Sequence, residues 1–344
     1  MKVALVRGAY LNNFEGQNYS GLPKTIQITG VSSKRPIHSS FSFPVRKLLS
    51  LTDFGVPNWL ANRMIGDSQY LVGLENAVQS FDIVHTADPH YYYSYQLAKM
   101  RKDGKIKRLI STSWETIPFN NESVAAKKRI KRFSMKYIDH FLCYTERAKK
   151  CLVTEGVKSQ KITVIPLGVD LNKFKPVLKK DLKSKSDKLR ILFTGRDVPE
   201  KGLQDLRSSI HQLIELGKVE LLVAGNIPYD KMPDVYRLAD IFAMSSKTTK
   251  TWEEQYGMSL IEAMASGLPV IAYRSGSIAE VLGQAGVLVK EGDIRSLTKH
   301  IEVLIHSLSM RTKLSRLSRR NSEIIYDSHA FSKKITEFYY SLTK

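Results

Sequence analysis

The segment that most constrains the fold is Glu254–Ala272, where a helix-forming run ends in a glycine and a proline and leads into an apolar run. Residues 258–266 are good helix formers, Gly267 suits the position after a helix, and Pro269 prevents the helix from continuing. Residues 268–273 are apolar and predict a buried strand. A short helix followed directly by a buried strand is typical of an α/β protein.

The loop that enters this helix has the features of a ligand site. Gly257 opens the helix, so the first backbone N–H groups have no partner within it and form an anion site for a phosphate. These groups belong to Met258, Ser259 and Leu260. Glu254 and Glu262 flank the site, and because carboxylates repel phosphate, we expect them to accept hydrogen bonds from neutral hydroxyls. The segment therefore predicts a sugar nucleotide as ligand; the alternative is that both glutamates are solvated.

These residues resemble the donor-binding signature of the family-four retaining glycosyltransferases, which have the GT-B fold. The resemblance lies in Glu-x7-Glu combined with Gly-x4-Glu-Ala-Met-Ala-x-Gly-x-Pro-Val-Ile, all within Glu254–Ile271. It implies transfer of a sugar from a nucleoside diphosphate sugar to an acceptor hydroxyl, with retention at the anomeric carbon. In this reading Glu254 orients the sugar and Glu262 holds the ribose.

A second motif lies after an apolar run that ends at residue 194. Gly195 allows close approach of the backbone to a ligand, while Arg196 and Lys201 place two cations between a strand and a helix, where an anion binds. The run from Gly195 to Gly202 is similar to the family motif Gly-Arg-x-x-x-x-Lys-Gly. The resemblance implies that Arg196 and Lys201 hold the donor diphosphate; surface exposure is the alternative.

The length of the chain predicts two domains. With 344 residues, 42% of them hydrophobic, it is long for one domain. The resemblance implies an α/β protein of GT-B architecture, with two facing Rossmann-like, doubly wound domains and a cleft between them. We expect a first, acceptor-side domain at residues 1–174 with a crossing helix at 327–344, and a nucleotide-sugar domain at 175–326. Residues 175–190 are polar and predict an exposed linker.

The second domain departs from the family pattern. The strand predicted at Val219–Gly225 is followed directly by Pro228–Tyr236, a segment that in relatives follows one further strand–helix unit. The missing unit contributes to the nucleotide-base side in relatives. The sequence therefore does not predict which nucleotide base the donor has, or whether the protein has full activity.

Acceptor-side candidates follow the strands of the first domain. Trp114 and Glu115 come after a predicted strand at 107–112, and loops at the carboxyl ends of strands line the crevice of doubly wound folds. Glu115 is an acceptor-side candidate or a loop cap. His85 ends another strand and is predicted more as a hydrogen-bonded residue than as a base. Four tyrosines cannot share one helix face, so some should be exposed near an acceptor or interface: these are Tyr91, Tyr92, Tyr93 and Tyr95.

The net charge of +20 suggests an anionic partner without identifying it. Residues 124–138 predict a basic amphipathic helix that either lies on an anionic membrane or buries its apolar stripe in its own domain. The basic residues of the membrane hypothesis are Lys127, Lys128, Lys131 and Arg132. No apolar run approaches roughly 18 residues, and the start is too short for a signal peptide. We expect a cytoplasmic protein, peripheral on the inner membrane face if the helix binds lipid.

Neither a metal nor another cofactor is expected. Cys143 and Cys151 lack the neighbouring ligands of a metal site and predict buried, reduced thiols. The chain contains no Asp-x-Asp motif, which holds a divalent metal across the diphosphate in the other large transferase fold. The expected partners are a nucleotide sugar and a glycan or lipid-linked acceptor, and not nucleic acid. Two alternatives remain: a sugar-nucleotide epimerase of the same fold, and a non-catalytic basic protein that binds membranes or nucleic acid.

Overall fold

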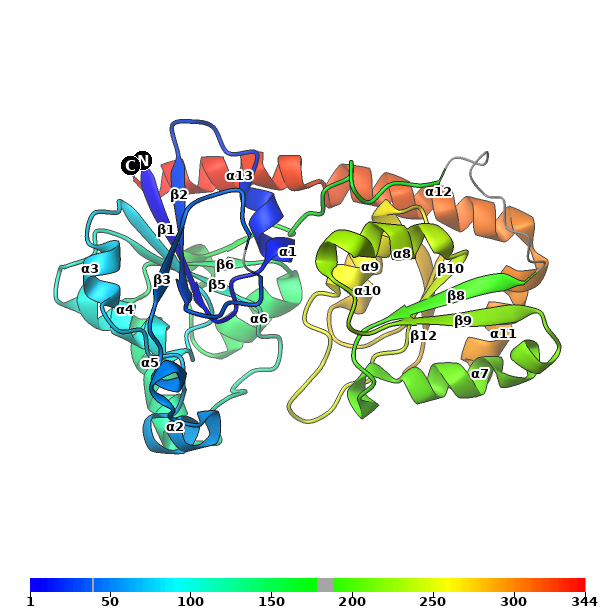
Figure 1. Ribbon diagram of the computed structural model, residues 1–344, viewed down its shortest axis with the longest axis horizontal. Helices are drawn as coiled ribbons and strands as arrows, with labels where there is room; N and C mark the ends of the chain where they lie inside the picture. Colours follow the sequence, from blue (N-terminus) through cyan, green and yellow to red (C-terminus); the bar gives the residue numbers. More distant parts are fainter. Residues whose placement is uncertain (39, 178–187, 344) are drawn as a thin grey trace. The chain divides into compact units, whose positions relative to one another are not determined.

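The computed structural model describes residues 1–38, 40–177 and 188–343, and the chain divides into two compact units (Figure 1). Unit 1 comprises Met1–Leu167 with His329–Lys344, and unit 2 comprises Gly168–Ser328. The first boundary thus lies seven residues before the predicted one, because Phe174 is buried in unit 2, with its ring 5.7 Å from that of Tyr236. Of the predicted linker, residues 178–187 lie outside the described residues.

Unit 1 contains a seven-stranded parallel sheet of order β3-β2-β1-β4-β5-β6-β7. The central strands are buried on both faces, which is why they appear in the sequence as continuous apolar runs. The strands are β1 (Lys2–Gly8), β2 (Gln27–Ser33), β3 (Val45–Leu48), β4 (Ile83–Thr86), β5 (Leu109–Ser113), β6 (His140–Cys143) and β7 (Ile162–Val164).

Helices connect these strands, and the last helix of the chain, α13, returns to unit 1. Its Tyr339 is fully buried and contacts His85 at the end of β4. The α-helices are α1 (Asn13–Gly16), α2 (Asn58–Ile65), α3 (Leu74–Val78), α4 (Tyr92–Lys102), α5 (Ala125–Tyr137), α6 (Glu146–Thr154) and α13 (Ser328–Ser341).

Unit 2 contains a five-stranded parallel sheet of order β12-β11-β10-β8-β9. The strands are β8 (Leu189–Thr194), β9 (Val219–Ala224), β10 (Ile241–Met244), β11 (Val270–Tyr273) and β12 (Gly286–Val289). The helices are α7 (Leu203–Glu215), α8 (Met232–Leu238), α9 (Met258–Ala265), α10 (Ile278–Leu282), α11 (Ile294–His306) and α12 (Leu308–Ile325). Residues 225–240 are all described and form no strand, so β9 lies at the edge of the sheet. This agrees with the prediction that one strand–helix pair is missing after β9.

Each unit is doubly wound, as predicted, and each has one point where the direction of winding reverses. In unit 1 the chain moves from β1 outward to β2 and β3, then returns to place β4 on the other side of β1. In unit 2 the reversal lies between β8 and β10. Loops leave the carboxyl ends of such strands in opposite directions and open a crevice, the usual ligand site of this architecture.

Gly168 lies where the segments that enter and leave unit 2 run side by side. Val169 N–H donates to the Tyr326 carbonyl at 2.8 Å, and Ser328 N–H donates to the Val169 carbonyl at 3.1 Å. A Cβ on residue 168 would lie 2.5 Å from the Ser328 nitrogen and 2.6 Å from the Asp327 carbonyl carbon. This close approach of two backbones gives a physical reason for a glycine at position 168.

We therefore expect Gly168→Ala to lower the free energy of unfolding by about 1–3 kcal/mol, because the added methyl group pushes the two backbones apart. Urea denaturation measures the change. Gly225→Ala is the matched control, since a Cβ there would meet only the Gly195 carbonyl oxygen, at 3.4 Å. Equal stability of the two variants would contradict the packing argument.

Candidate active site

Three loops at the carboxyl ends of β8, β10 and β11 are tied together by hydrogen bonds in unit 2. Ser245 Oγ donates to the Gly202 carbonyl at 2.8 Å, and Ser277 N–H donates to the Glu254 carbonyl at 2.8 Å. Between them, Lys247 N–H donates to the Glu200 carbonyl at 2.8 Å. The predicted motifs at 195–202 and 254–262 are thus brought to the reversal point between β8 and β10.

Glycine makes this approach possible. Gly202 has a φ of 66°, and a Cβ on it would lie only 1.9 Å from the Ser245 carbonyl oxygen. Gly276, with a φ of 50°, would place its Cβ 2.2 Å from the Glu254 carbonyl oxygen. Side chains at either position would force the loops apart, so both residues fix the spacing of the candidate site.

The centre of the site is an ion pair between Lys201 and Glu254. Lys201 Nζ lies 2.8 Å from Glu254 Oε2, which also accepts a hydrogen bond from Ser246 Oγ at 3.0 Å. The Lys201 ammonium lies 4.8 Å from the centroid of the Trp252 ring, within the range of a cation–π interaction. The side chains of Lys201 and Glu254 are only 20% and 12% exposed. The pair is therefore held in place yet reachable from solvent.

Arg196 lies on the same loop and is exposed. Gly195 before it has a φ of 138°. No carboxylate of the described residues pairs with the Arg196 guanidinium. Its charge is thus free for an anionic ligand, whereas the charge of Lys201 is already partnered.

The start of α9 offers two backbone donors. Gly257 is the N-cap, with a φ of 81°, and the N–H groups of Met258 and Ser259 have no acceptor among the described residues. Leu260 was predicted to offer a third, but its N–H donates to the Gly257 carbonyl at 2.9 Å and its side chain is fully buried. The first turn is tighter than an α-helical turn, which closes that donor.

Glu262 is buried beneath Tyr236. The Tyr236 hydroxyl donates to Glu262 Oε2 at 2.8 Å, and burial raises the pKa of the Glu262 carboxyl to about 7. Tyr236 comes from α8, which packs against α9. The role of Glu262 as a ribose ligand stays a prediction, since the tyrosine covers the carboxylate that would bind it.

In unit 1, Glu115 caps its own loop. Its Oε1 accepts hydrogen bonds from the N–H groups of Thr116 and Ile117, both at 3.0 Å. Its Oε2 accepts from the side-chain amides of Asn120 and Asn121 at 2.9 and 3.1 Å. The structure thus places Glu115 in the loop-capping role that was the alternative to acceptor binding, because its oxygens are occupied by the protein.

Trp114 is half-buried beside Tyr144, with ring centroids 4.5 Å apart and nearly perpendicular planes. Its backbone N–H donates to Asp88 Oδ1 at 2.9 Å. Trp114 therefore remains a candidate for contact with an acceptor, because part of its ring is exposed at the carboxyl end of β5.

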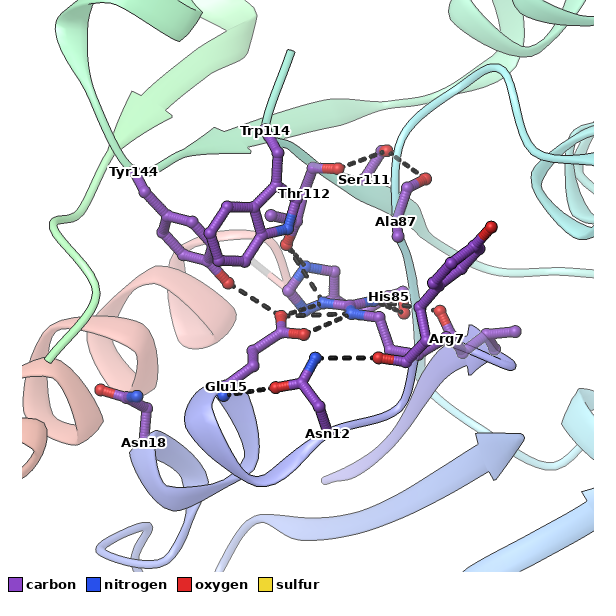
Figure 2. Close-up of polar contacts among 12 residues, drawn as sticks. Arg7, Asn12, Glu15, Asn18, His85, Ala87, Ser111, Thr112, Trp114 and Tyr144 are labelled. Carbon is purple, nitrogen blue, oxygen red and sulfur yellow. Dashed lines mark hydrogen bonds and ion pairs between the residues drawn. The ribbon is translucent and has the colours of Figure 1, made fainter. Parts of the chain in front are cut away.

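His85 belongs to a buried polar network that Figure 2 shows. Its Nδ1 hydrogen-bonds with Tyr339 Oη at 2.8 Å and its Nε2 with Thr112 Oγ1 at 2.7 Å. Burial, and the nearby charge of Arg7, lower the pKa of His85 well below its ordinary value. Both nitrogens are used and the ring has no exposed surface, so the structure does not place His85 on the acceptor side.

The same network contains a buried ion pair between Arg7 and Glu15 (Figure 2). Arg7 Nε lies 2.9 Å from Glu15 Oε2, and Arg7 Nη2 lies 2.7 Å from Glu15 Oε1. Tyr144 Oη donates to the same carboxylate at 2.8 Å, and Arg7 Nη1 donates to the His85 carbonyl at 3.0 Å. The pair joins α1, β1, β4 and β6 in one satisfied group.

Besides Tyr91, the reversal point of unit 1 gathers polar residues that were not predicted from the sequence. Burial raises the pKa of Asp88 to about 7 and that of Asp67 to about 6. Burial also lowers the pKa of His90 to about 3. Tyr10, after β1, and Tyr91, after β4, pack with ring centroids 5.0 Å apart. The available signal was the run Asp88-Pro89-His90 directly after a predicted strand.

The basic helix α5 does not present all of its predicted membrane residues. Lys131 is 2% exposed and lies 2.5 Å from Glu155 Oε1, so it faces the interior rather than a bilayer. Lys127 is half-buried, and burial lowers the pKa of its ammonium. Lys128 and Arg132 are exposed but pair with Glu122.

The apolar stripe of α5 is also occupied. Ile130 is buried, and the Phe133 ring lies 5.0 Å from that of Tyr95 on α4. The stripe therefore packs within unit 1, which was the alternative to membrane binding. None of the described helices is both long enough and apolar enough to cross a membrane.

The two cysteines are free and buried. Burial raises the pKa of both thiols, Cys143 and Cys151, so neither is poised as a nucleophile. The described residues contain no group of three His, Cys, Asp or Glu side chains arranged to hold a metal ion.

We expect Glu15→Ala to lower the free energy of unfolding by about 3–5 kcal/mol, because it leaves the Arg7 guanidinium buried without a counter-charge. Glu75→Ala is the control within the same unit, since it removes an exposed ion pair with Lys105 and should change stability much less. Urea denaturation followed by circular dichroism measures both. Similar losses in the two variants would show that burial of the pair does not matter.

Comparisons with known proteins agree with this geometry. The family described as Glycosyl transferases group 1 matches residues 214–321, and Glycosyltransferase Family 4 matches residues 40–173. A sulfoquinovosyl transferase of Arabidopsis thaliana is 30% identical over 46% of this chain and 30% of its own length. The capsular polysaccharide biosynthesis glycosyltransferase CapM of Staphylococcus aureus is 25% identical over 62% of this chain and 65% of its own. The chain thus spans less than two thirds of the length of these two relatives.

Among solved structures, Anabaena HepE in complex with UDP is similar in fold. Its TM-score is 0.76 at 14% sequence identity, and the match covers 99% of this chain and 100% of that one. With family matches on both halves and the same doubly wound units, the chain belongs to the group 1 glycosyltransferases, family four, which have the GT-B fold.

Proposed function

We propose that this protein transfers a sugar from a nucleoside diphosphate sugar to an acceptor hydroxyl with retention at the anomeric carbon. The observation that carries the proposal is the Lys201–Glu254 pair, 2.8 Å apart at the reversal point of unit 2. A cation and a carboxylate side by side suit a ligand that has a phosphate next to a sugar. The cation attracts the phosphate, and the carboxylate accepts hydrogen bonds from sugar hydroxyls.

The surrounding groups suit a departing diphosphate. As the glycosidic bond breaks, negative charge develops on the leaving oxygen, and preorganised cations and N–H groups stabilise it. Lys201 and the exposed Arg196 supply the cations, and Met258 and Ser259 supply the N–H groups at the start of α9. Without ligand, Glu254 neutralises Lys201, so the site is not left with an unpaired, half-buried charge.

The retaining outcome and the direct use of a nucleotide sugar rest on the family resemblance. No carboxylate is assigned as a nucleophile in this proposal. Instead, the leaving phosphate helps to deprotonate an acceptor that attacks from the same face of the sugar. Glu254 then orients the sugar rather than attacking it.

The acceptor is proposed to bind unit 1 at the reversal point between β1 and β4. Tyr10, which follows β1, is exposed, whereas Asp88 and His90, which follow β4, are buried. The exposed tyrosine ring suits contact with a sugar. By its name, the relative CapM acts in capsular polysaccharide biosynthesis, which supports assembly of a cell-surface polysaccharide or glycolipid as the process. The structure of HepE with UDP makes UDP the first nucleotide to test.

Thermal unfolding with UDP, GDP and ADP tests donor binding, because a ligand of the native state raises the melting temperature. We expect one nucleotide to stabilise the protein most. If none of the three does so, the assignment of unit 2 as the donor site fails. Once donor and acceptor are found, release of nucleoside diphosphate should require the acceptor, whereas an epimerase needs none.

Lys201→Ala and Arg196→Ala should each weaken the affinity for that nucleotide by about 10–150-fold, because each removes a charge-assisted contact to the diphosphate. Isothermal titration calorimetry measures the change. Lys218→Ala removes an exposed cation elsewhere in unit 2 and is the control. Wild-type affinity in both site variants would contradict the assignment.

Metal independence is part of the proposal, because Arg196 and Lys201 neutralise the diphosphate in place of a divalent ion. We expect nucleotide affinity and turnover to be largely unchanged in saturating EDTA. A reversible loss that magnesium or manganese restores would show that the two cations do not suffice.

A further inference from the structure

A groove of about 510 Å³ lies on unit 1 beside α3 and α4, which pack against each other. Its volume falls within the usual range of small-molecule sites, about 300–1,000 Å³. Three tyrosines give it an aromatic wall, and amide and amino groups form its polar edge. The lining residues include Tyr70, Tyr92, Tyr95, Asn76, Gln96 and Lys99.

The three tyrosines form a continuous row. The Tyr92 ring lies 5.5 Å from the Tyr70 ring and 5.5 Å from the Tyr95 ring, in edge-to-face arrangements. All three side chains are half-buried. Their hydroxyls have no hydrogen-bond partner among the described residues, although other tyrosines of unit 1, such as Tyr144 and Tyr339, are hydrogen-bonded.

The walls of the groove are held rigidly. Gln96 Nε2 donates to the Leu71 carbonyl at 2.9 Å, and Leu71 N–H donates to Gln96 Oε1 at 3.0 Å. This pair fastens α4 to the segment before α3. Phe133 supports the Tyr95 ring from α5, with centroids 5.0 Å apart. The groove is therefore formed before a ligand arrives, which lowers the entropic cost of binding.

We propose that this groove binds a saccharide chain and is a second subsite for the acceptor glycan, an inference that rests on the proposed function. Tyrosine offers an apolar ring face together with a hydroxyl, which matches a sugar ring with its C–H surface and hydroxyl rim. Asn76 and Lys99 add hydrogen-bonding groups at the edge. Lys105 and Glu75, which also line the groove, neutralise each other at 2.7 Å, so a neutral glycan fits better than a strongly charged one.

Tyr92, which lines the groove, is the first residue of α4 and lies next in the chain to the proposed acceptor end of unit 1. Tyr92 N–H donates to Asp67 Oδ2 at 2.7 Å, and α4 begins two residues after His90. From there the groove follows α4 for its 11 residues, which is about 16 Å at the rise of an α-helix. A glycan whose terminal sugar lies at the reversal point between β1 and β4 would place its preceding sugars along the tyrosine row.

An array of neutral and acidic bacterial oligosaccharides of differing lengths, probed with the full-length protein, tests the proposal. We expect binding that favours longer, neutral chains, and we expect Tyr70→Ala and Tyr95→Ala each to weaken the affinity for the strongest array ligand by about tenfold. Tyr70→Phe and Tyr95→Phe keep the aromatic rings and should therefore lose less affinity for this ligand than the alanine variants do. Tyr340→Ala removes an exposed tyrosine of α13 outside the groove and should bind as wild type does.

Failure of the groove proposal can be distinguished from failure of the proposed function, because the two are measured by different ligands. Nucleotide stabilisation measured on the same variants reports on unit 2 and should be unchanged. An array without any binding, or binding that survives both alanine variants, would overturn the groove as a glycan site even where nucleotide binding is intact. Binding of lipid vesicles or peptides, in place of saccharides, through the same tyrosines would overturn it too.

Discussion

The candidate donor site depends on one close backbone contact, in which the carbonyl of Ser245 occupies the space that a side chain on residue 202 would need. This contact joins the loop after β8 to the loop after β10. It brings Lys201 within 2.8 Å of Glu254, two residues that are 53 positions apart in the chain. The arrangement of unit 2 follows from this: a cation and a carboxylate share one solvent-accessible place. The first two N–H groups of α9 have no acceptor in the part of the chain that the structure describes.

The centre of unit 1 contains a guanidinium, a carboxylate and an imidazole with almost no solvent contact. Such groups are costly to bury unless every one is paired. Arg7, Glu15 and His85 meet this condition by bonding to one another and to Thr112 and Tyr144, as Figure 2 shows. Tyr339 of α13 bonds to the second ring nitrogen of His85. The network gives α13 a specific partner in unit 1. The reversal point between β1 and β4 contains other residues. Among them are Asp88, whose pKa burial raises, and His90, whose pKa burial lowers.

In unit 2, the helix that follows β9 forms part of the surroundings of Glu262. Tyr236 of α8, which is the first helix after the edge strand β9, is fully buried, and its hydroxyl bonds to Glu262. A carboxyl that is solvent-exposed has an ordinary pKa, whereas this one is raised to about 7 by burial. Burial thus sets the pKa of a residue in the main sequence signature.

The sequence by itself predicted the alternation of strands and helices, because glycines, prolines and apolar periods act locally. The two donor motifs and the missing strand–helix unit were predicted from the resemblance to the family. The sequence also posed the correct alternatives for Glu115 and the α5 stripe. It did not decide between them, since loop capping and burial of Lys131 depend on Asn120, Asn121 and Glu155, which are brought in by tertiary folding. Only the three-dimensional structure decided that the Leu260 N–H is used within the first turn of α9, which groups bond to the two ring nitrogens of His85, and that the tyrosines line a groove. Each depends on which neighbour fills the space beside a side chain, and neighbours distant in the chain are not encoded by local pattern.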